Sequence, residues 1–338
     1  MDLPILWFVI IAVLWAGFLI LEGFDFGVGM LHGVVGRTER EREVALGTIK
    51  PVWDGNEVWL VVAVGATFAA FPTWYASMFS AYYGALVVVL AGLIIRGVSF
   101  EFREGSEGGG WRRTWSTTMT VGSLVIPFLL AMTLANLLYG LPIGADQDFA
   151  GDVTDLLTPY GLYVGLMVVV LCILLGATFL ALKTGGVVRS RAARLARWVA
   201  PVVVALVLGF VLWTEYVADG DFVIGPLGVL PVLPILACVW LVFRDREGWA
   251  FTFAVATMAA VVAVLFVNLY PNVMVSSTDP SFSLTVEGAA ASPYALRVIT
   301  IVALALLPVV LVYQGWTYYV FRQRVDADSE SDSTATAY

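Results

Sequence analysis

Residues 4–34 read PILWFVIIAVLWAGFLILEGFDFGVGMLHGV, an apolar run long enough to cross a bilayer as one helix. The composition of the whole 338-residue chain is apolar as well: 60% of its residues are hydrophobic, 13% are charged and its mean hydropathy is +0.89. An ordinary soluble domain carries about 25% charged residues. The composition therefore excludes a soluble enzyme, a disordered chain and a secreted disulfide scaffold. The net charge of −8 argues against a nucleic-acid partner.

Further apolar blocks follow the first one along the chain, at residues 57–71, 75–95, 115–140, 160–182, 199–218, 223–243, 249–270 and 296–321. They lack the alternating pattern of barrel strands, and a backbone in lipid must satisfy its own hydrogen bonds. The first block has no basic start and no small-residue cleavage site, so it is not a removable signal peptide. We predict an all-α polytopic membrane protein with about nine transmembrane helices, and a tight hairpin at Phe71-Pro72.

The lysines and arginines alternate with these blocks. All of them except Arg297 lie in the segments after blocks 1, 3, 5 and 7 or after the last block. The positive-inside rule then predicts an outer N-terminus and a cytoplasmic C-terminus. We expect residues 1–324 to form a single transmembrane domain. Residues 325–338 are acidic and rich in Ser and Thr, which predicts a disordered cytoplasmic tail.

Two acids stand inside the first block. Glu22 and Asp25 are three residues apart, so they share one face of a helix. They are either an acid pair at the cytoplasmic interface or carboxylates that face a protein-lined proton or ion path, since charged groups inside a span are functional candidates. Small residues spaced four apart permit close helix contact, and this spacing relates Gly23 to Gly27 and Gly29 to Gly33.

A second pair of acids precedes the second block, in the segment KPVWDGNEVWL at residues 50–60. Asp54 followed by Glu57 resembles a capping box, in which Asp54 would accept amide hydrogens at the start of the helix. The alternative is a carboxylate at the cytoplasmic mouth of a proton path. The two interpretations are compatible.

Arg96 follows an unbroken apolar run and is predicted to lie at membrane depth or just inside it. It requires a carboxylate partner there, and Asp25, Asp54 and Glu101 lie on the same side. The alternative is a simple positive-inside anchor.

No motif for a phosphate site, a zinc site or a catalytic triad is present, so we expect no catalytic residue in this chain. His32 is the only histidine and is a weak metal candidate at best, since an interfacial histidine near a helix end is the simpler interpretation. Cys172 and Cys238 lie within apolar blocks and are expected to be packing residues. Three polar residues in the spans are expected to join helices: Asn136, Asn268 and Gln314.

Four motifs in order make the chain recognisable: EGFDFGVGML at 22–31, PVWDGNEVWL at 51–60, FAAFPTWYA at 68–76 and RGVSFEFR at 96–103. Together they resemble subunit II of cytochrome bd quinol oxidase. The resemblance is dense over residues 1–103 and continues more loosely to about residue 322. The segments PNVMVSST at 271–278 and SLT at 283–285 are also similar to the family's segment before its last helix.

The resemblance implies a function that composition does not show. In this family, subunit I carries haem b and haem d and the quinol site, and the complex oxidises quinol and reduces O₂ to water. It takes protons from the cytoplasm and so generates a proton-motive force without pumping. Subunit II is a haem-free partner in a heterodimer, supports haem assembly and can hold a structural quinone. Small single-span accessory subunits and a location in the bacterial cytoplasmic membrane are also implied.

The resemblance also assigns roles residue by residue. It associates Asp54 with a proton channel at the subunit interface, and it matches Asp25, Trp53 and Arg96 to the family's corresponding acid, tryptophan and arginine. We therefore expect Asp54, Asp25, Glu57 and Glu22 to be proton-path candidates.

Two positions depart from the family pattern. Glu101 stands where the family has Asp or a similar residue, which leaves the importance of Glu101 open. The family often has Gln at the position of Glu57, and a charged Glu57 near Asp54 would raise the proton affinity of one of them by like-charge repulsion.

Two other functions remain open from the residues alone. A secondary transporter also has many spans and charged intramembrane residues, but the prolines here show no repeat and the acids gather at the inner face. A purely structural membrane scaffold is the other alternative.

Overall fold

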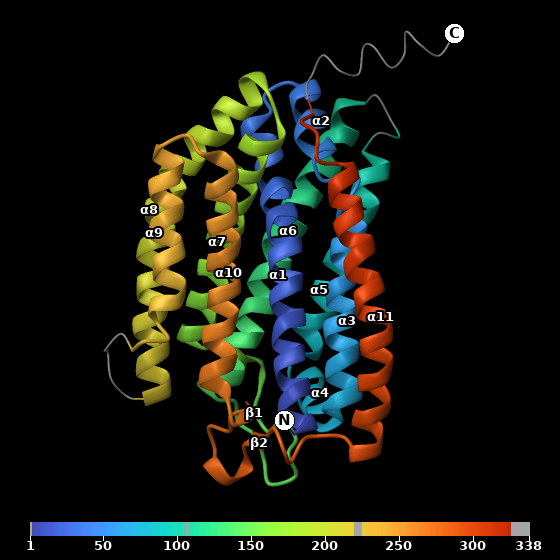
Figure 1. Ribbon diagram of the computed structural model, residues 1–338, viewed down its shortest axis with the longest axis vertical. Coiled ribbons are helices and arrows are strands. Elements are labelled where there is room, and N and C mark those ends of the chain that lie inside the picture. Colours follow the sequence, from blue (N-terminus) through green and yellow to red (C-terminus); the bar gives the residue numbers. More distant parts are fainter. Residues whose placement is uncertain (1, 104, 106–107, 220–224, 326–338) are drawn as a thin grey trace.

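The computed structural model describes residues 2–103, 105, 108–219 and 225–325, so the predicted tail lies outside the described residues except for Val325. The chain forms a bundle of long helices (Figure 1). The helices are α1 Leu3–Val35, α2 Glu39–Gly47, α3 Trp53–Ala70, α4 Pro72–Ala81, α5 Tyr83–Phe102, α6 Gly109–Tyr139, α7 Pro159–Lys183, α8 Gly186–Asp219, α9 Val229–Phe243, α10 Glu247–Leu269 and α11 Pro293–Val320. Two short strands, β1 Asn272–Met274 and β2 Leu284–Thr285, and two 3₁₀ turns, Val153–Leu156 and Pro280–Phe282, complete the described elements.

Each predicted apolar block contains helix in the residues that the structure describes, so the all-α class is confirmed. Within the described residues, seven helices are long and apolar enough to cross a membrane: α1, α5, α6, α7, α8, α10 and α11. Helix α9 has only 15 residues, and α3 carries Asp54, Asn56 and Glu57 near its start. Both nevertheless run alongside the long helices (Figure 1).

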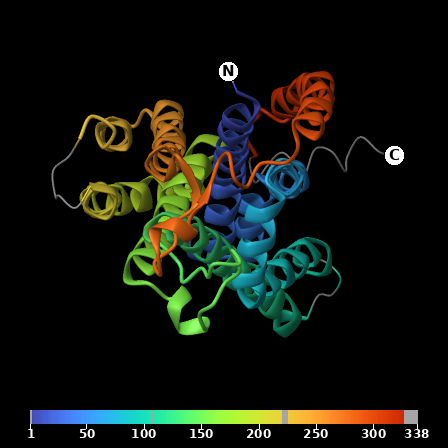
Figure 2. The same cartoon turned by 90° about the horizontal axis from the view of Figure 1, so that it is seen from below.

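Helix α1 lies in the middle of the bundle, with α3, α6, α7 and α10 around it (Figure 2). Helix α7 is the most enclosed span, since 83% of its apolar window is buried. Helices α8 and α9 lie at one side of the bundle and α11 at the other. Only 6% of the apolar window of α11 is buried, so most of its surface is available to lipid or to another chain.

The two ends of the bundle differ in character. The end that holds α2 also holds the connections α5–α6, α7–α8 and α9–α10, where the basic residues are concentrated (Figure 1). At the opposite end β1 pairs antiparallel with β2, with Asn272 opposite Thr285. The segments PNVMVSST and SLT therefore meet in one small sheet. The backbone there also binds residues after α6, since Leu141 N donates to Val275 O at 3.0 Å.

The third block is not one helix but is divided between α4 and α5, and α3 is joined to α4 at the predicted position by the single residue Phe71. Pro72 begins α4, where its missing N–H is not needed. The chain bends again at Tyr82 before α5 starts. The Tyr82 ring is fully buried, and its hydroxyl accepts a hydrogen bond from Asn136 Nδ2 on α6 at 2.9 Å. The residue at the bend is thus bound to α6, and Asn136 joins helices as predicted.

Two helices are longer than the apolar pattern predicted. Helix α5 runs to Phe102, so Arg96 lies inside it and not in the loop after it. Helix α8 starts at Gly186, so the arginines between 189 and 197 are helical. This early part of α8 contains good helix formers, and Ala192, Ala196 and Ala200 are buried at a spacing of four. Hydropathy alone missed it because its other face is basic.

The glycine spacing in α1 has one strong structural consequence. A Cβ at Gly27 would overlap the carbonyl oxygen of Cys172 on α7 and would lie 2.6 Å from Gly176 N. The backbones of α1 and α7 therefore touch at Gly27 and Gly176. Gly33 has no atom within 4 Å of its Cβ position, so the predicted contact role does not apply to it.

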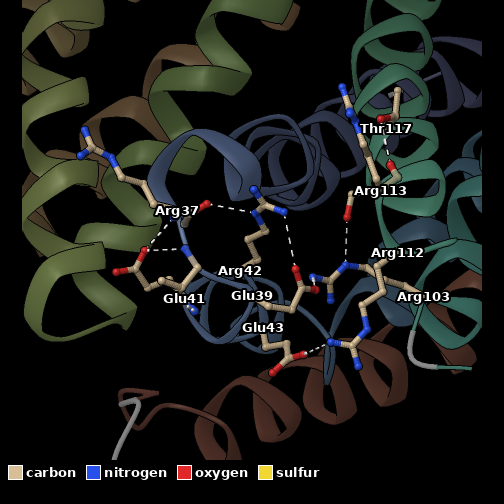
Figure 3. Close-up of polar contacts among 12 residues, drawn as sticks. Arg37, Glu39, Glu41, Arg42, Glu43, Arg103, Arg112, Arg113 and Thr117 are labelled. Atoms are coloured by element: carbon tan, nitrogen blue, oxygen red, sulfur yellow. Dashed lines mark hydrogen bonds and ion pairs between the residues drawn. The ribbon is translucent and has the colours of Figure 1, made fainter. Parts of the chain in front are cut away.

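Three acids of helix α2 form ion pairs with arginines of other helices at the basic end of the bundle (Figure 3). We call them the α2 clamp: Glu39, Glu41 and Glu43. Glu39 pairs with Arg103 at the end of α5. Glu43 pairs with Arg112 of α6 at 3.8 Å, and Glu41 pairs with Arg191 of α8 at 2.7 Å. The clamp therefore ties α5, α6 and α8 to the segment between α1 and α3.

Glu41 makes the clamp sensitive to acid. Its carboxylate accepts hydrogen bonds from Arg37 N at 2.6 Å, from Arg191 and from Thr38 N, and these lower the pKa of Glu41 below its usual value of 4.5. A lowered folded-state pKa adds stability above the unfolded pKa and loses it as pH falls through the folded value. We expect the difference in melting temperature between wild type and Glu41→Gln to be largest near neutral pH and to shrink below about pH 4.5. A constant difference measured down to pH 3.5 would contradict this.

Candidate functional site

Helix α1 places both of its acids inside the protein. Glu22 and Asp25 are each 0% exposed. From α1 they face α3 and α5. We call the group that they form with residues of these two helices the acid cluster: Glu22, Asp25, Asn56, Glu57 and Arg96. The surrounding helices cover both side chains, so neither carboxylate lies on the surface of this chain.

Arg96 of α5 is the cation of the acid cluster, and its side chain is 0% exposed. Its Nη1 lies 3.0 Å from Glu22 Oε2 and 3.5 Å from Glu57 Oε2. The guanidinium also lies over two aromatic rings, 4.8 Å from the centroid of Phe26 and 5.8 Å from that of Phe100. Arg96 is thus held by charge and by ring faces, and it is no simple interfacial anchor.

These partners differ from the expected ones. We expected Arg96 to pair with Asp25, Asp54 or Glu101, but its ion pairs are with Glu22 and Glu57. Glu101 is exposed. The expectation failed because Arg96 lies six residues before the end of α5, where its side chain reaches Glu22 of α1 and Glu57 of α3.

Asp25 is connected to two other helices by a chain of side-chain hydrogen bonds through the amide of Asn56. Asn56 Nδ2 of α3 donates to Asp25 Oδ2 at 2.7 Å. Asn56 Oδ1 in turn accepts hydrogen bonds from two residues of α11, at 2.9 Å from Gln314 Nε2 and at 2.8 Å from the Tyr318 hydroxyl. Polar residues thus connect α1, α3 and α11 in a continuous chain.

Sequence reasoning missed Asn56 and Tyr318 and gave Gln314 only a general joining role. Asn56 lies within a motif already quoted, two residues from Asp54 and next to Glu57. A polar side chain in the first turns of an apolar helix was the available signal. Asn268 binds Val264 O of its own helix at 2.9 Å, so its predicted role between helices is wrong.

The start of α3 differs from the predicted capping box. Asn56 N donates to Val52 O at 3.1 Å, so Val52 is the N-cap and the helix begins before Asp54. No side-chain hydrogen bond caps this helix. The turn at Ile49–Val52 supplies the first backbone bonds instead, since Trp53 N donates to Ile49 O at 3.0 Å. Asp54 is exposed in the first turn of α3, and Glu57 follows on the same face, with its side chain 23% exposed.

Trp53 packs the start of α3 against the end of α5. Its ring stacks on Phe100 at a centroid distance of 4.8 Å and an angle of 13°. Trp53 also lies 3.2 Å from the Cβ position of Gly97, so a side chain there would push it away. Because Phe100 also faces Arg96, Trp53 indirectly supports the position of the guanidinium.

The residues that could hold a metal are few. His32 is 1% exposed, and its Nδ1 lies 2.8 Å from Gly29 O in the last turns of α1. His32 lies near the end of α1, as predicted, and its side chain is covered by neighbouring helices. In the described part of the chain, no group of three or more His, Cys, Asp and Glu residues could hold a metal ion. Cys172 and Cys238 are free and buried, as expected of packing residues.

Comparison with known proteins identifies the family. The family model described as cytochrome bd terminal oxidase subunit II matches residues 3–321. This chain belongs to the cytochrome bd terminal oxidase subunit II family. It is 42% identical over 325 residues to the cytochrome bd ubiquinol oxidase subunit 2 of Bacillus subtilis, covering 95% of this chain and 96% of that one. It is 34% identical to the cytochrome bd-I ubiquinol oxidase subunit 2 of Escherichia coli K12, covering 99% and 98% of the two chains.

A solved structure supports the fold. The bd oxidase structure from Geobacillus thermodenitrificans contains a chain that matches with a TM-score of 0.65 at 20% identity, covering 95% of this chain and 99% of that one. The apolar helices and the bacterial relatives together identify a multi-pass protein of a bacterial inner membrane. The resemblance inferred from the four motifs is therefore confirmed.

Proposed function

We propose that this chain is the haem-free partner of a haem-bearing subunit I in a heterodimer that oxidises quinol and reduces O₂ to water, and that it supports assembly of that subunit. The family membership supports this proposal. The chain's only imidazole, His32, cannot supply both ligands of a bis-histidine haem, which agrees with a place for haem b and haem d in the partner. A structural quinone and small single-span accessory subunits are part of the same proposal, and quinol reaches the complex through the partner.

The second part of the proposal is that the acid cluster belongs to a proton path from the cytoplasm to the partner. The observation that supports it is the gathering of two fully buried carboxylates, Glu22 and Asp25, and the partly exposed Glu57 near one guanidinium. Glu22 Oε1 and Asp25 Oδ1 have no hydrogen-bond partner among the residues that the structure describes. One cation cannot neutralise three carboxylates, two of them fully buried, so the cluster is stabilised when it binds protons.

Asp54 is the entry residue in this proposal. It is exposed on the basic end of α3, three positions before Glu57, which touches Arg96. A proton taken up at Asp54 would pass to Glu57 and then to the buried acids by carboxylate and water transfer. The basic residues at this end support a cytoplasmic orientation by the positive-inside rule.

The neighbouring surface fits a partner chain. Large apolar side chains cover the outer faces of α3 and α5, and their exposed fractions are high: Val61 70%, Phe68 56%, Leu90 60% and Ile94 59%. An apolar membrane surface next to Asp54 is suited to helix packing with subunit I, which would bring the partner's groups close to the acid cluster.

Asp54→Asn tests the proton path in the purified complex. We expect oxygen consumption with quinol to fall severalfold while the haem spectrum stays unchanged, because the amide cannot carry a proton. Turnover of the variant should recover as pH falls if proton supply limits the rate, and Asp54→Glu should restore most of it. A purely structural role would not produce this pH dependence.

Glu101→Gln is the matched control, because Glu101 is exposed at the same end and makes no ion pair with Arg96. It should turn over like wild type. Normal turnover in Asp54→Asn, with normal haem content, would reject the channel role and leave Asp54 as a surface acid near a helix start.

A further inference from the structure

A cavity of about 520 Å³ opens between α1, α7, α10 and α11 near the basic end of the bundle. It lies on the side where α11 is separated from α10, so that α1 is visible between these two helices (Figure 1). Its size is within the range of ordinary ligand sites, about 300–1,000 Å³. We call it the α11 groove.

The floor of the α11 groove is aromatic. Phe24 of α1 lies 4.3 Å from Phe179 of α7, 5.8 Å from Phe251 of α10 and 6.5 Å from Tyr318 of α11, measured between ring centroids. All four side chains line the cavity, together with aliphatic residues such as Val255. These walls suit an acyl chain and offer little to a polar peptide.

The mouth of the groove is basic, with Lys183, Arg322 and Arg324 in its lining. The chain after α11 crosses the end of α7 here, since Val325 N donates to Lys183 O at 2.8 Å. Lys183 Nζ binds the carbonyl oxygens of Phe321 and Gln323, the latter at 2.9 Å. The three cations are therefore gathered at one place by backbone contacts.

The positive charge of these three basic side chains, which we call the rim, is not neutralised by nearby carboxylates. Within residues 2–103, 105, 108–219 and 225–325, neither Lys183 nor Arg322 has a carboxylate partner, and both bind only carbonyl oxygens or a ring. Arg324 lies 3.5 Å from Glu247, which binds Arg189 more closely, at 2.8 Å. The rim thus carries unbalanced positive charge above an apolar cavity that opens at the membrane surface.

We infer that the α11 groove binds an anionic phospholipid, with its phosphate at Lys183, Arg322 and Arg324 and an acyl chain over the aromatic floor. Basic pockets between transmembrane helices on the cytoplasmic side favour acidic head groups. The acidic residues after Val325 match the rim in charge, but that segment, DADSESDSTATAY, has no large aliphatic side chain to fill the groove. The inference does not depend on the proton path.

Native mass spectrometry of the purified complex tests this, with phosphatidylglycerol and phosphatidylethanolamine of identical acyl chains added after delipidation. The rim variant is Lys183→Gln, Arg322→Gln and Arg324→Gln together. Its matched control removes the same charge from exposed arginines outside the groove: Arg37→Gln, Arg194→Gln and Arg244→Gln. Val255→Trp fills the groove and leaves the rim intact, and a chain ending at Val325 removes the acidic tail.

We expect wild type, the control and the shortened chain to bind phosphatidylglycerol about tenfold or more tightly than phosphatidylethanolamine, given three cations at the rim. The rim variant should lose this preference, and Val255→Trp should weaken binding of both lipids. Equal binding of the two lipids by wild type, an unchanged preference in the rim variant, or a quinone in place of phospholipid would overturn the inference. Phosphatidylglycerol binding seen only in the shortened chain would assign the rim to the acidic tail and would also overturn it.

Discussion

Replacing Arg96 by methionine is expected to prevent assembly of a stable complex or to lower its melting temperature strongly. The change leaves Glu22, Asp25 and Glu57 without their cation at a site where Glu22 and Asp25 are 0% exposed. Removing one partner of a buried ion pair costs about 3–5 kcal/mol, because the remaining charge is uncompensated. Yield, haem content and melting temperature of the purified complex measure the effect.

Two further variants separate charge from packing at this site. Arg96→Met combined with Glu22→Gln should recover part of the stability, because it removes the acid that lies closest to the guanidinium. Arg194→Met changes an exposed arginine of α8 and should behave like wild type. If Arg96→Met alone kept the wild-type melting temperature, the guanidinium would not be what stabilises the buried acids.

The second large effect is expected at the crossing of α1 and α7. Gly27→Leu should abolish assembly, and Gly27→Ala should destabilise the complex by about 1–3 kcal/mol, the usual cost of overpacking. The reason is that the added Cβ meets main-chain atoms of Cys172 and Gly176, which cannot move aside as a flexible side chain can. Thermal unfolding of the purified complex measures the cost.

Gly33 provides the matched control within the same helix. Gly33→Ala gains the same helix propensity, about 1 kcal/mol, and its Cβ meets no atom within 4 Å. It should be neutral or stabilising. Equal melting temperatures for Gly27→Ala and Gly33→Ala would show that the helices separate at no cost, contrary to the contact between Gly27 and Gly176.

The membrane class and the position of the helices could be predicted from hydropathy, because lipid requires long apolar segments with internally satisfied backbones. The boundaries were less predictable. Helix α8 begins far before its apolar block because one face is basic, and α5 ends after Arg96 because a buried ion pair keeps that arginine inside the bundle. At the bend, the Tyr82 hydroxyl accepts a hydrogen bond from Asn136, 54 residues away in the chain, which no local pattern indicates.

The candidate site was predictable in its members but not in its connections. Glu22, Asp25, Glu57 and Arg96 could be singled out, since ionisable residues in apolar segments are rare and costly. The partners of Arg96 and the relay from Asp25 through Asn56 to Tyr318 could not. They join residues up to 262 positions apart in the chain, and no local pattern records which helix faces will meet.

From the sequence by itself come the membrane class, the approximate number of helices, the one-sided distribution of basic residues and the family motifs, because composition and spacing are properties of the chain. The tertiary structure alone decided that Arg96 binds Glu22 and Glu57, that Asp54 is exposed and not a cap, and that α1 and α7 touch at Gly27. These depend on how the helices rotate and pack against one another, and that is settled only when all of them are in place.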